Sequence, residues 1–483
     1  MRYNQSMENH AQVNRLGTHR IGKLMFEFAI PAIIGLVANG LYNIIAGIFL
    51  GHGVGPQGLA TATIATPLMV FSISVAMLIG AGGNALAALK LGEGKYEETE
   101  KVIGNTCTLM LVAAVVVTVL VNLFMGPVLA LSGANAETWE YSHVFMRIIS
   151  IGFILQFLGM GLNNFIRTAG DPNRALYTMI AGTVVCIIFN YLFVMVFRWG
   201  IAGSAWATLT GQGVSAAMVL WYFIFSKKAP FRLKLPYLRL IPRLVKSILT
   251  LGLASFVLQV AAAIVTMIVN NQLQFYGELS SITAVGAQAA IGVTSRIALF
   301  AFFPIMGIAI AAQPIFGYNY GAQNFERVKS TFKIALIPII IIGLFFWLLI
   351  HIFPREIVFL FGIAGDLEAF TVTAMQVQMF LMPFVGLQVI TANYFQSSGQ
   401  PFRSMFVSMT RQLLYLIPLL YLMPYLAYNS LFLAGVTPLE AIYYTYPIAD
   451  VLSLITAGSM MLIEFRKLNV KIQKRKQAAP SLE

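Results

Sequence analysis

Apolar residues run along this chain in long uninterrupted blocks, and short polar stretches separate the blocks. Many blocks exceed the roughly 18–20 residues that cross a hydrocarbon core of about 30 Å. They do not alternate between apolar and polar residues, so they predict helices rather than the strands of a barrel. The pattern predicts spans at 24–50, 58–89, 102–131, 141–167, 175–197, 202–226, 247–275, 285–317, 331–353, 367–395, 404–427 and 439–465.

Composition agrees with this pattern. The chain has 483 residues, of which 58% are apolar and 10% are charged, and its mean hydropathy is +0.80. A soluble domain carries about 25% charged residues, so an ordinary soluble globular protein is excluded. The first eighteen residues are polar, and we expect no cleavable signal peptide. The sequence therefore predicts an all-α integral membrane protein with about twelve transmembrane helices.

The net charge is +13, and the positions of the basic residues indicate a membrane protein rather than one that binds nucleic acid. If both termini are cytoplasmic, 26 of the 31 Lys and Arg residues fall on cytoplasmic segments, as the orientation rule requires. The densest segment, 227–246, has seven basic residues and no acidic one. A basic tail at 466–476 either anchors the topology or rests near anionic lipid headgroups. We expect a multi-pass protein with both termini in the cytoplasm and no nucleic-acid partner.

Two pairs of segments repeat at one common offset along the chain. NNFIRTAGDPNR at 163–174 recurs as ANYFQSSGQPFR at 392–403, and GEGKYE at 92–97 recurs as GAQNFE at 321–326, so both pairs are separated by the same interval. Six spans separate equivalent points, and six is even, so both halves run in the same direction through the membrane. This predicts a parallel repeat about an axis along the membrane normal, an arrangement that transporters use for alternating access.

The repeat predicts how the chain divides into domains. We expect an N-lobe at 1–226 that holds six helices and a C-lobe at 247–483 that holds the other six. The basic segment 227–246 would then be a cytoplasmic linker between the lobes.

One segment carries a specific family resemblance. QPIFGYNYGAQNFERVK at 313–329 resembles the signature that follows the eighth span of multidrug and toxic-compound extrusion (MATE) transporters. Similar matches occur at PAIIGLVANGLYNIIAGIFLGHGVG in span one, GIAGSAWATLTGQ in span six and TYPIADVL in span twelve. The resemblance is greatest to the prokaryotic branch with MepA-like and DinF-like members, and it covers the chain from about residue 23 to residue 467.

The resemblance implies a pair of six-helix lobes in a V shape around a central cavity. It also implies secondary-active export of organic, often cationic drugs in exchange for H⁺ or Na⁺, from the bacterial inner membrane. The expected partners are such small molecules, the coupling ion and membrane lipids, and we expect a monomer. No cofactor and no enzymatic activity are expected: no histidine pair has metal spacing, and no GxxxxGK[ST] loop is present.

The chain departs from the family pattern at its N-lobe cation site. Many prokaryotic members have an Asp where this chain has Ala46, and a second family Asp is replaced by Asn190. Tyr42 and Thr208 still match that site, and Gln259 stands near a position where other branches carry a Glu in span seven. The usual N-lobe proton mechanism therefore does not transfer to this chain.

Few ionisable residues lie deep within the predicted spans. Asp450, Arg296 and Arg411 all belong to the C-lobe, and each is a functional candidate because burying a charge in lipid costs several kcal/mol. One interpretation is that Asp450 couples transport to the ion, with Arg296 or Arg411 responding to its charge. The other is a permanent ion pair that fixes the packing of the lobe.

Two further carboxylates lie near span ends. Glu27, four residues before Pro31, is either a second coupling group or a structural carboxylate at a helix start. Glu464 lies at the cytoplasmic border of span twelve, and we expect it to be solvated.

Uncharged polar residues within spans either bond neighbouring helices or line a wet cavity. The candidates for the substrate and cation cavity are Tyr42, Asn43, Gln156, Asn163, Asn190, Thr208, Gln259, Gln288 and Gln388.

Two other functions stay open beside the exporter. A flippase for lipid-linked oligosaccharides, or another exporter of the same superfamily, would share the lobed architecture, but we expect it to carry several basic residues in its cavity. A twelve-span facilitator of another fold would carry a Gly-Asp-Arg-Gly pattern after span two, where this chain has LGEGKYEETEK.

Overall fold

A computed structural model of the chain describes residues 14–132, 134, 138–280, 282, 284–361, 365–429 and 435–478. These residues form helices and no strand. Ten helices are long and apolar enough to cross a membrane, and two bent pairs bring the number to twelve if each pair is one span. The twelve predicted spans all coincide with these helices.

The first six spans are formed by α2 (Ile21–Gly53), α3 (Pro56–Gly92), α4 (Tyr96–Leu131), the pair α5 (Trp139–Ile151) and α6 (Phe153–Thr168), α7 (Pro172–Asn190) with the π-helical η1 (Tyr191–Val196), and α8 (Gly200–Phe225). The other six are formed by α9 (Pro242–Glu278), α10 (Ala284–Gly321), α11 (Phe325–Ile352), the pair α13 (Asp366–Gln378) and α14 (Met382–Ser397), α15 (Pro401–Met409) with the π-helical η3 (Thr410–Leu416) and α16 (Ile417–Tyr428), and α17 (Pro438–Ala478). Two short elements, η2 (Leu235–Leu238) and α12 (Pro354–Phe359), lie between spans.

Local sequence explains where these helices begin. Pro172, Pro401 and Pro242 stand at the first helical position, where the missing N–H is not needed. Asp171 caps α7 by accepting a hydrogen bond from the Arg174 backbone N–H at 3.3 Å.

The backbone repeats its special conformations at the offset found in the sequence. The fourth span bends by 53° at Gly152, and the tenth bends by 45° between Gln378 and Met382. Gly94 and Gln323 are equivalent under the repeat and both have positive φ, as do the equivalent Gly170 and Gly399. The repeated segments thus form equivalent turns in the two halves.

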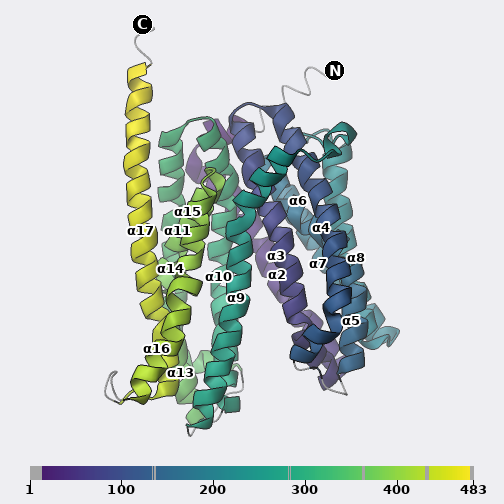
Figure 1. Ribbon diagram of the computed structural model, residues 1–483, viewed down its shortest axis with the longest axis vertical. Helices are drawn as coiled ribbons and strands as arrows, with labels where there is room; N and C mark the ends of the chain where they lie inside the picture. Colours follow the sequence, from purple (N-terminus) through teal and green to yellow (C-terminus); the bar gives the residue numbers. More distant parts are fainter. Residues whose placement is uncertain are drawn as a thin grey trace.

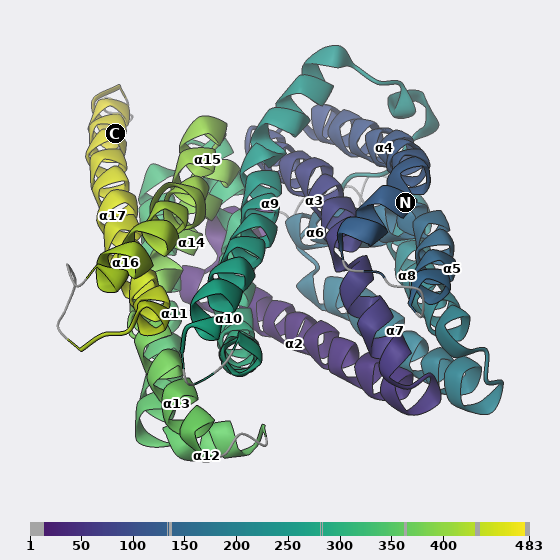
Figure 2. The same cartoon turned by 60° about the horizontal axis from the view of Figure 1, so that its bottom comes forward.

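The helices form two bundles, with α2 to α8 on one side and α9 to α17 on the other (Figures 1 and 2). Both ends of the described chain lie at one end of the molecule, here called the terminal end; the opposite end is called the far end. Tyr318 donates a hydrogen bond to Asn14 at 3.1 Å, and Arg475 donates to the backbone carbonyl of Gln323. Residues near both ends of the described chain therefore contact the end of α10 or the α10–α11 connection.

Glycines close the seam between the bundles at the terminal end. A methyl group added at Gly92 would overlap the backbone of Tyr318, and one at Gly321 would overlap the backbone of Leu89. These contacts are reciprocal, because the repeat offset relates Gly92 to Gly321 and Leu89 to Tyr318. The α3 and α10 backbones therefore meet around the pseudo-twofold axis of the repeat.

The repeat also relates the neighbouring helix pair α2–α10 to the pair α9–α3. Gly307 of α10 packs against Ile33 of α2, and the ring of Phe303 packs against Gly40. Gly252 of α9 packs against the backbone of Leu78 of α3. Small residues of this kind let membrane helices approach closely.

Towards the far end the seam between α2 and α10 opens. A methyl group added at Gly47 of α2 or at Gly292 of α10 would meet nothing within 4 Å. Ile44 of α2 is 56% exposed, and Leu299 of α10 is 54% exposed. We call this part of the α2–α10 interface, beyond Gly40 and Phe303, the outer seam.

The segment between α8 and α9 packs along α4. Asn105 and Thr108 donate hydrogen bonds to the backbone carbonyls of Tyr237 at 3.3 Å and Leu238 at 2.7 Å. The Lys234 ammonium lies 2.5 Å from the Glu100 carboxylate. This segment therefore belongs structurally to the first bundle, and α9 begins at Pro242, five residues before the predicted span.

The close approach of α3 and α9 predicts that a larger residue at their contact will destabilise the protein. Gly252→Ala places a methyl group against the Leu78 backbone, and we expect it to cost roughly 1–3 kcal/mol by overpacking. Thermal unfolding of the purified protein measures this cost. Gly458→Ala in α17 is the matched control, because a methyl group there meets nothing within 4 Å; equal melting temperatures for both variants would contradict the packing described.

Candidate functional site

A buried ion pair joins α17 to the π-helical segment η3. The Arg411 Nε atom lies 2.5 Å from Asp450 Oδ1, and the Asp450 side chain is 2% exposed. Tyr415 and Thr456, of the same two elements, share a hydrogen bond of 2.8 Å between their hydroxyl groups. π-helical turns are rare and occur frequently at functional sites.

Arg296 does not join this pair. It is exposed on α10, and among the described residues no carboxylate lies within ion-pair distance of it. Of the two arginines named as partners for Asp450, the structure brings together only Arg411 and Asp450.

A second polar cluster lies in the first bundle. The Tyr42 hydroxyl of α2 and the Thr208 hydroxyl of α8 are 2.9 Å apart, and Cys186 and Asn190 of α7 lie beside them. Asn190 is fully buried, and its Oδ1 atom accepts no hydrogen bond within the described part of the chain. The cluster presents hydroxyl, thiol and amide groups.

Three of the candidate amides bond neighbouring helices. Asn163 donates to the Ala175 carbonyl at 2.9 Å, and Gln388 donates to the Val407 carbonyl at 2.9 Å. Gln156 accepts from the Ser72 hydroxyl at 3.1 Å. These contacts link α6 to α7, α14 to α15 and α6 to α3.

The remaining candidate residues lie in separate parts of the structure. Glu27 pairs with Arg15 at 2.8 Å near the terminal end, where both side chains are about one-third exposed. Gln259 is half-buried on α9, and Gln288 is exposed at the start of α10. The side chain of Asn43 lies outside the described part of the structure.

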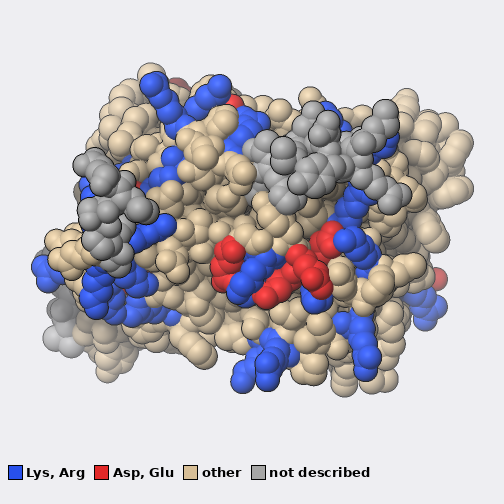
Figure 3. Space-filling model, turned by 90° about the horizontal axis from the view of Figure 1, so that it is seen from above, with Lys and Arg blue, Asp and Glu red and all other residues tan. Residues whose placement is uncertain are grey.

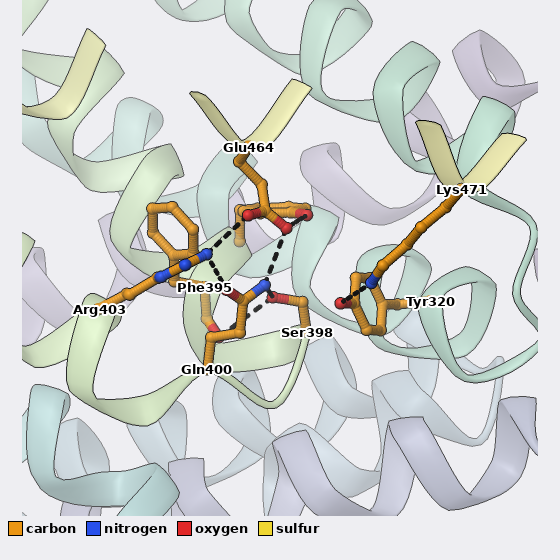
Figure 4. A network of polar contacts seen from close by, with 8 residues as sticks. Tyr320, Phe395, Ser398, Gln400, Arg403, Glu464 and Lys471 are labelled. Atoms are coloured by element: carbon orange, nitrogen blue, oxygen red, sulfur yellow. Dashed lines mark hydrogen bonds and ion pairs between the residues drawn. The ribbon is translucent and has the colours of Figure 1, made fainter. Parts of the chain in front are cut away.

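The expectation that Glu464 is solvated is wrong. Its side chain is 3% exposed and lies 2.7 Å from Arg403 Nη1 (Figure 4). Tyr394 and Gln400 also donate hydrogen bonds to Glu464 Oε1, at 3.1 and 3.0 Å. The position of Glu464 at a span end suggested water, but α14 and α15 fold over it. The repeat at 392–403 was the signal that could have located its partners.

In the first bundle the equivalent arginine pairs with a carboxylate from a different position. Arg174, the repeat equivalent of Arg403, lies 3.1 Å from Asp171 and donates to the Ser226 hydroxyl at 2.9 Å. Gln400 replaces Asp171 in the second half, and Glu464 of α17 supplies the carboxylate instead.

The repeated turns of both bundles line a groove of about 790 Å³ at the terminal end. Acidic residues form a row between basic ones across this face (Figure 3), with Glu93 bonded to both Lys90 and Lys95. Burial raises the pKa of the Glu93 carboxyl, but hydrogen bonds from Lys95 and Lys90 outweigh this effect and hold the pKa below its ordinary value.

The basic tail of α17 also contacts this region. Lys471 donates to the Tyr320 hydroxyl at 3.1 Å (Figure 4), and Lys476 lies 2.9 Å from Glu326. These contacts attach the tail to the α10–α11 connection.

A model of the MatE family matches residues 31–192 and 263–422, one stretch in each bundle. The chain belongs to the MatE family. It is accordingly an integral membrane transporter and not an enzyme.

Curated relatives agree with this assignment to MatE. The probable multidrug resistance protein YoeA of Bacillus subtilis is 25% identical over 71% of this chain and 73% of its own length. The multidrug export protein MepA of Staphylococcus saprophyticus is 22% identical over 83% of this chain and 87% of its own.

Solved structures share the fold. A MOP-superfamily transporter from Pyrococcus furiosus, described as having a binding pocket of reverse polarity, has a TM-score of 0.86, is 22% identical and matches 95% of this chain and 98% of its own. A MATE transporter in an outward-facing conformation also has a TM-score of 0.86 at 22% identity, over 94% of this chain and 98% of its own.

The Glu464 network predicts unequal effects in the two bundles. Arg403→Gln leaves a buried carboxylate without its cation, and we expect the free energy of unfolding to fall by roughly 1–3 kcal/mol. The cost stays below that of a fully buried pair because Arg403 itself is 39% exposed. Arg174→Gln is the repeat-related control, and we expect a smaller loss because Asp171 is closer to solvent, at 15% exposure. Thermal unfolding of both variants tests this; a larger loss for Arg174→Gln would refute it.

Proposed function

We propose that this transporter exports small organic compounds across the bacterial plasma membrane by alternating access, driven by the inward movement of H⁺ or Na⁺. The observation that carries the proposal is the seam between the bundles, which is closed at Gly40 and Gly307 and open at Gly47 and Gly292. A seam packed at one end and open at the other is the geometry of one end state of a rocking cycle. The relatives MepA, a multidrug export protein, and YoeA, a probable multidrug resistance protein, support this class of substrate.

The proposed orientation places the terminal end in the cytoplasm. Lys and Arg residues surround the acidic row on that face (Figure 3), and basic residues concentrate on cytoplasmic segments of membrane proteins. In this orientation the closed end of the seam faces the cytoplasm and the outer seam faces outward.

The N-terminal segment provides a latch for the closed end. Arg327 of α11 donates hydrogen bonds to the backbone carbonyls of Leu16 at 3.2 Å and His19 at 2.6 Å. Asn319 of α10 donates to the same Leu16 carbonyl at 2.9 Å. The Leu16 side chain is 1% exposed. This segment continues into α2 of the first bundle, so the bonds tie that bundle to the second, and an inward-open state has to break or move them.

Ion coupling is assigned to Asp450. Its carboxylate is buried in the second bundle against Arg411, and protonation or Na⁺ binding would weaken this ion pair. A ligand that changes such a pair biases a two-state equilibrium by its differential affinity for the two states. The first-bundle cluster at Tyr42 holds no carboxylate, which favours the second bundle for the coupling step.

Asp450→Asn tests the coupling role. We expect transport of a fluorescent drug into proteoliposomes to lose its response to an imposed pH or Na⁺ gradient, roughly tenfold or more, while exchange without a gradient persists. Glu440→Gln, at the start of the same helix, is the control. Full gradient-driven transport by a folded Asp450→Asn protein would remove Asp450 from this role, and loss of drive by both gradients in the unmodified protein would sink the antiport itself.

Arg327→Gln tests the latch. We expect a cysteine introduced at Leu16 to react with a soluble maleimide several-fold faster when Arg327 no longer holds the segment. Lys329→Gln is the control, because Lys329 bonds Asn469 of α17 at 2.5 Å within the second bundle. An unchanged rate in the Arg327→Gln background would contradict the latch.

A further inference from the structure

Arg296 is a charged residue within a transmembrane helix, and no acidic residue in the described part of the chain pairs with it. It lies twelve residues from the far end of α10, which corresponds to a depth of about 18 Å. Its side chain is exposed, whereas Arg411 is held by the buried Asp450. No hydrogen bond or ion pair joins Arg296 to another residue in the described ranges. A guanidinium at this depth requires water or an anion, because lipid does not solvate it.

Helical periodicity shows which way Arg296 faces. Phe303 and Gly307 pack against α2, and Arg296 precedes them by seven and eleven residues, which places it on the same side of α10. Thr294 and Ile305, on the opposite side of the helix, are fully buried. Arg296 therefore faces α2 across the outer seam rather than the second bundle or the lipid.

The outer seam has room for a ligand beside Arg296. Gly292 lies one turn beyond Arg296, and the space in front of its Cα is empty, as it is in front of Gly47 across the seam. Phe300, one turn to the other side of Arg296, is 43% exposed, and Ile44 of α2 is 56% exposed. The ligand would thus meet apolar side chains on both sides of a single positive charge.

The adjoining helices add polar but uncharged groups. Gly252 of α9 packs against α3, and Gln259 and Asn270 follow it by seven and eighteen residues, which places them on the same side of α9. Gln259 is half-buried and Asn270 is exposed. Phe71 of α3 is 39% exposed. Among the described residues, none on these faces is a carboxylate.

We infer that Arg296 binds the acidic group of an amphipathic organic anion (a carboxylate, sulfonate or phosphate ester) whose apolar body lies between α2 and α10. The inference rests on the proposed function for the direction of transport, and it replaces the cationic substrates that the family resemblance implies with anionic ones. Guanidinium groups form strong charge-assisted hydrogen bonds with such acids, and a water-poor seam strengthens them. An organic cation would meet Arg296 with repulsion. The carboxylates of the facing helices lie at helix ends: Glu27 of α2 pairs with Arg15, and Glu278 is the last residue of α9.

A pair of matched dyes tests the inference. 8-Anilinonaphthalene-1-sulfonate and N-phenyl-1-naphthylamine share their aromatic rings, and only the first carries a sulfonate. We expect Arg296→Gln to weaken binding of the sulfonate dye about tenfold or more in neutral-lipid nanodiscs, while binding of the uncharged dye stays unchanged. Arg296→Lys should retain most of the preference, and Arg296→Glu should abolish it.

Arg355→Gln is the control, because Arg355 is exposed in α12 between spans. Unchanged binding of the uncharged dye shows that each variant is folded. Equal weakening of both dyes, or equal sulfonate binding by the unmodified protein and Arg296→Gln, would overturn the inference.

Two sources of the acid are separated by lipid composition. If phosphatidylglycerol nanodiscs suppress sulfonate binding in the unmodified protein compared with phosphatidylcholine nanodiscs, the site also accepts a lipid headgroup; if they do not, it takes soluble anions. Both results require the Arg296 dependence. Binding needs no gradient, so Arg296-dependent binding without gradient-driven export would refute only the proposed function. Export with binding indifferent to Arg296 would refute only this inference.

Discussion

The reciprocal contact between α3 and α10 is the constraint on which the rest of the structure depends. Gly92 meets the Tyr318 backbone, and Gly321 meets the Leu89 backbone. No side chain therefore separates the two helix backbones at this point. The repeat places both contacts about one axis, and α2 and α9 then pack beside α10 and α3. Close packing at the terminal end leaves the far ends of α2 and α10 apart, which creates the outer seam. Any side chain larger than hydrogen would separate the bundles where they are now joined.

The two bundles share this framework but differ in chemistry. Asn163 donates a hydrogen bond to the Ala175 carbonyl in the first, and Ser404 donates to the Ala392 carbonyl in the second. These are the same two positions of the repeat, with the donor moved from one helix to the other. The buried carboxylates are similarly unequal: Asp450 and Glu464 both belong to α17, while the cluster around Tyr42 has none. The buried carboxylates of α17 therefore have no counterpart in the Tyr42 cluster of the first bundle.

Much of the fold could be predicted from the sequence because lipid leaves few alternatives. Long apolar blocks have to be helices, and the common offset of the repeat located the turns at Gly94 and Gly170 together with their equivalents. Side-chain partners were harder to predict. Asp450 could have paired with Arg296 or Arg411, and the choice depends on how each helix is rotated about its own axis. Glu464 looked solvated because sequence shows its depth but not that α14 and α15 cover it. The attachment of residues 232–241 to α4 depends on Glu100 and Asn105, which carry no signal of their own.

In the proposed transport cycle, the two ends of the seam open in alternation. Spin labels on Gly47→Cys with Gly292→Cys report the distance across the outer seam, and labels on Lys95→Cys with Glu326→Cys report it at the terminal end. Electron–electron distance measurements in liposomes, with and without the driving gradient, compare the two. Alternating access predicts that the outer distance shortens as the terminal distance lengthens. Distances that change in the same direction, or an outer distance that stays constant during transport, would contradict it.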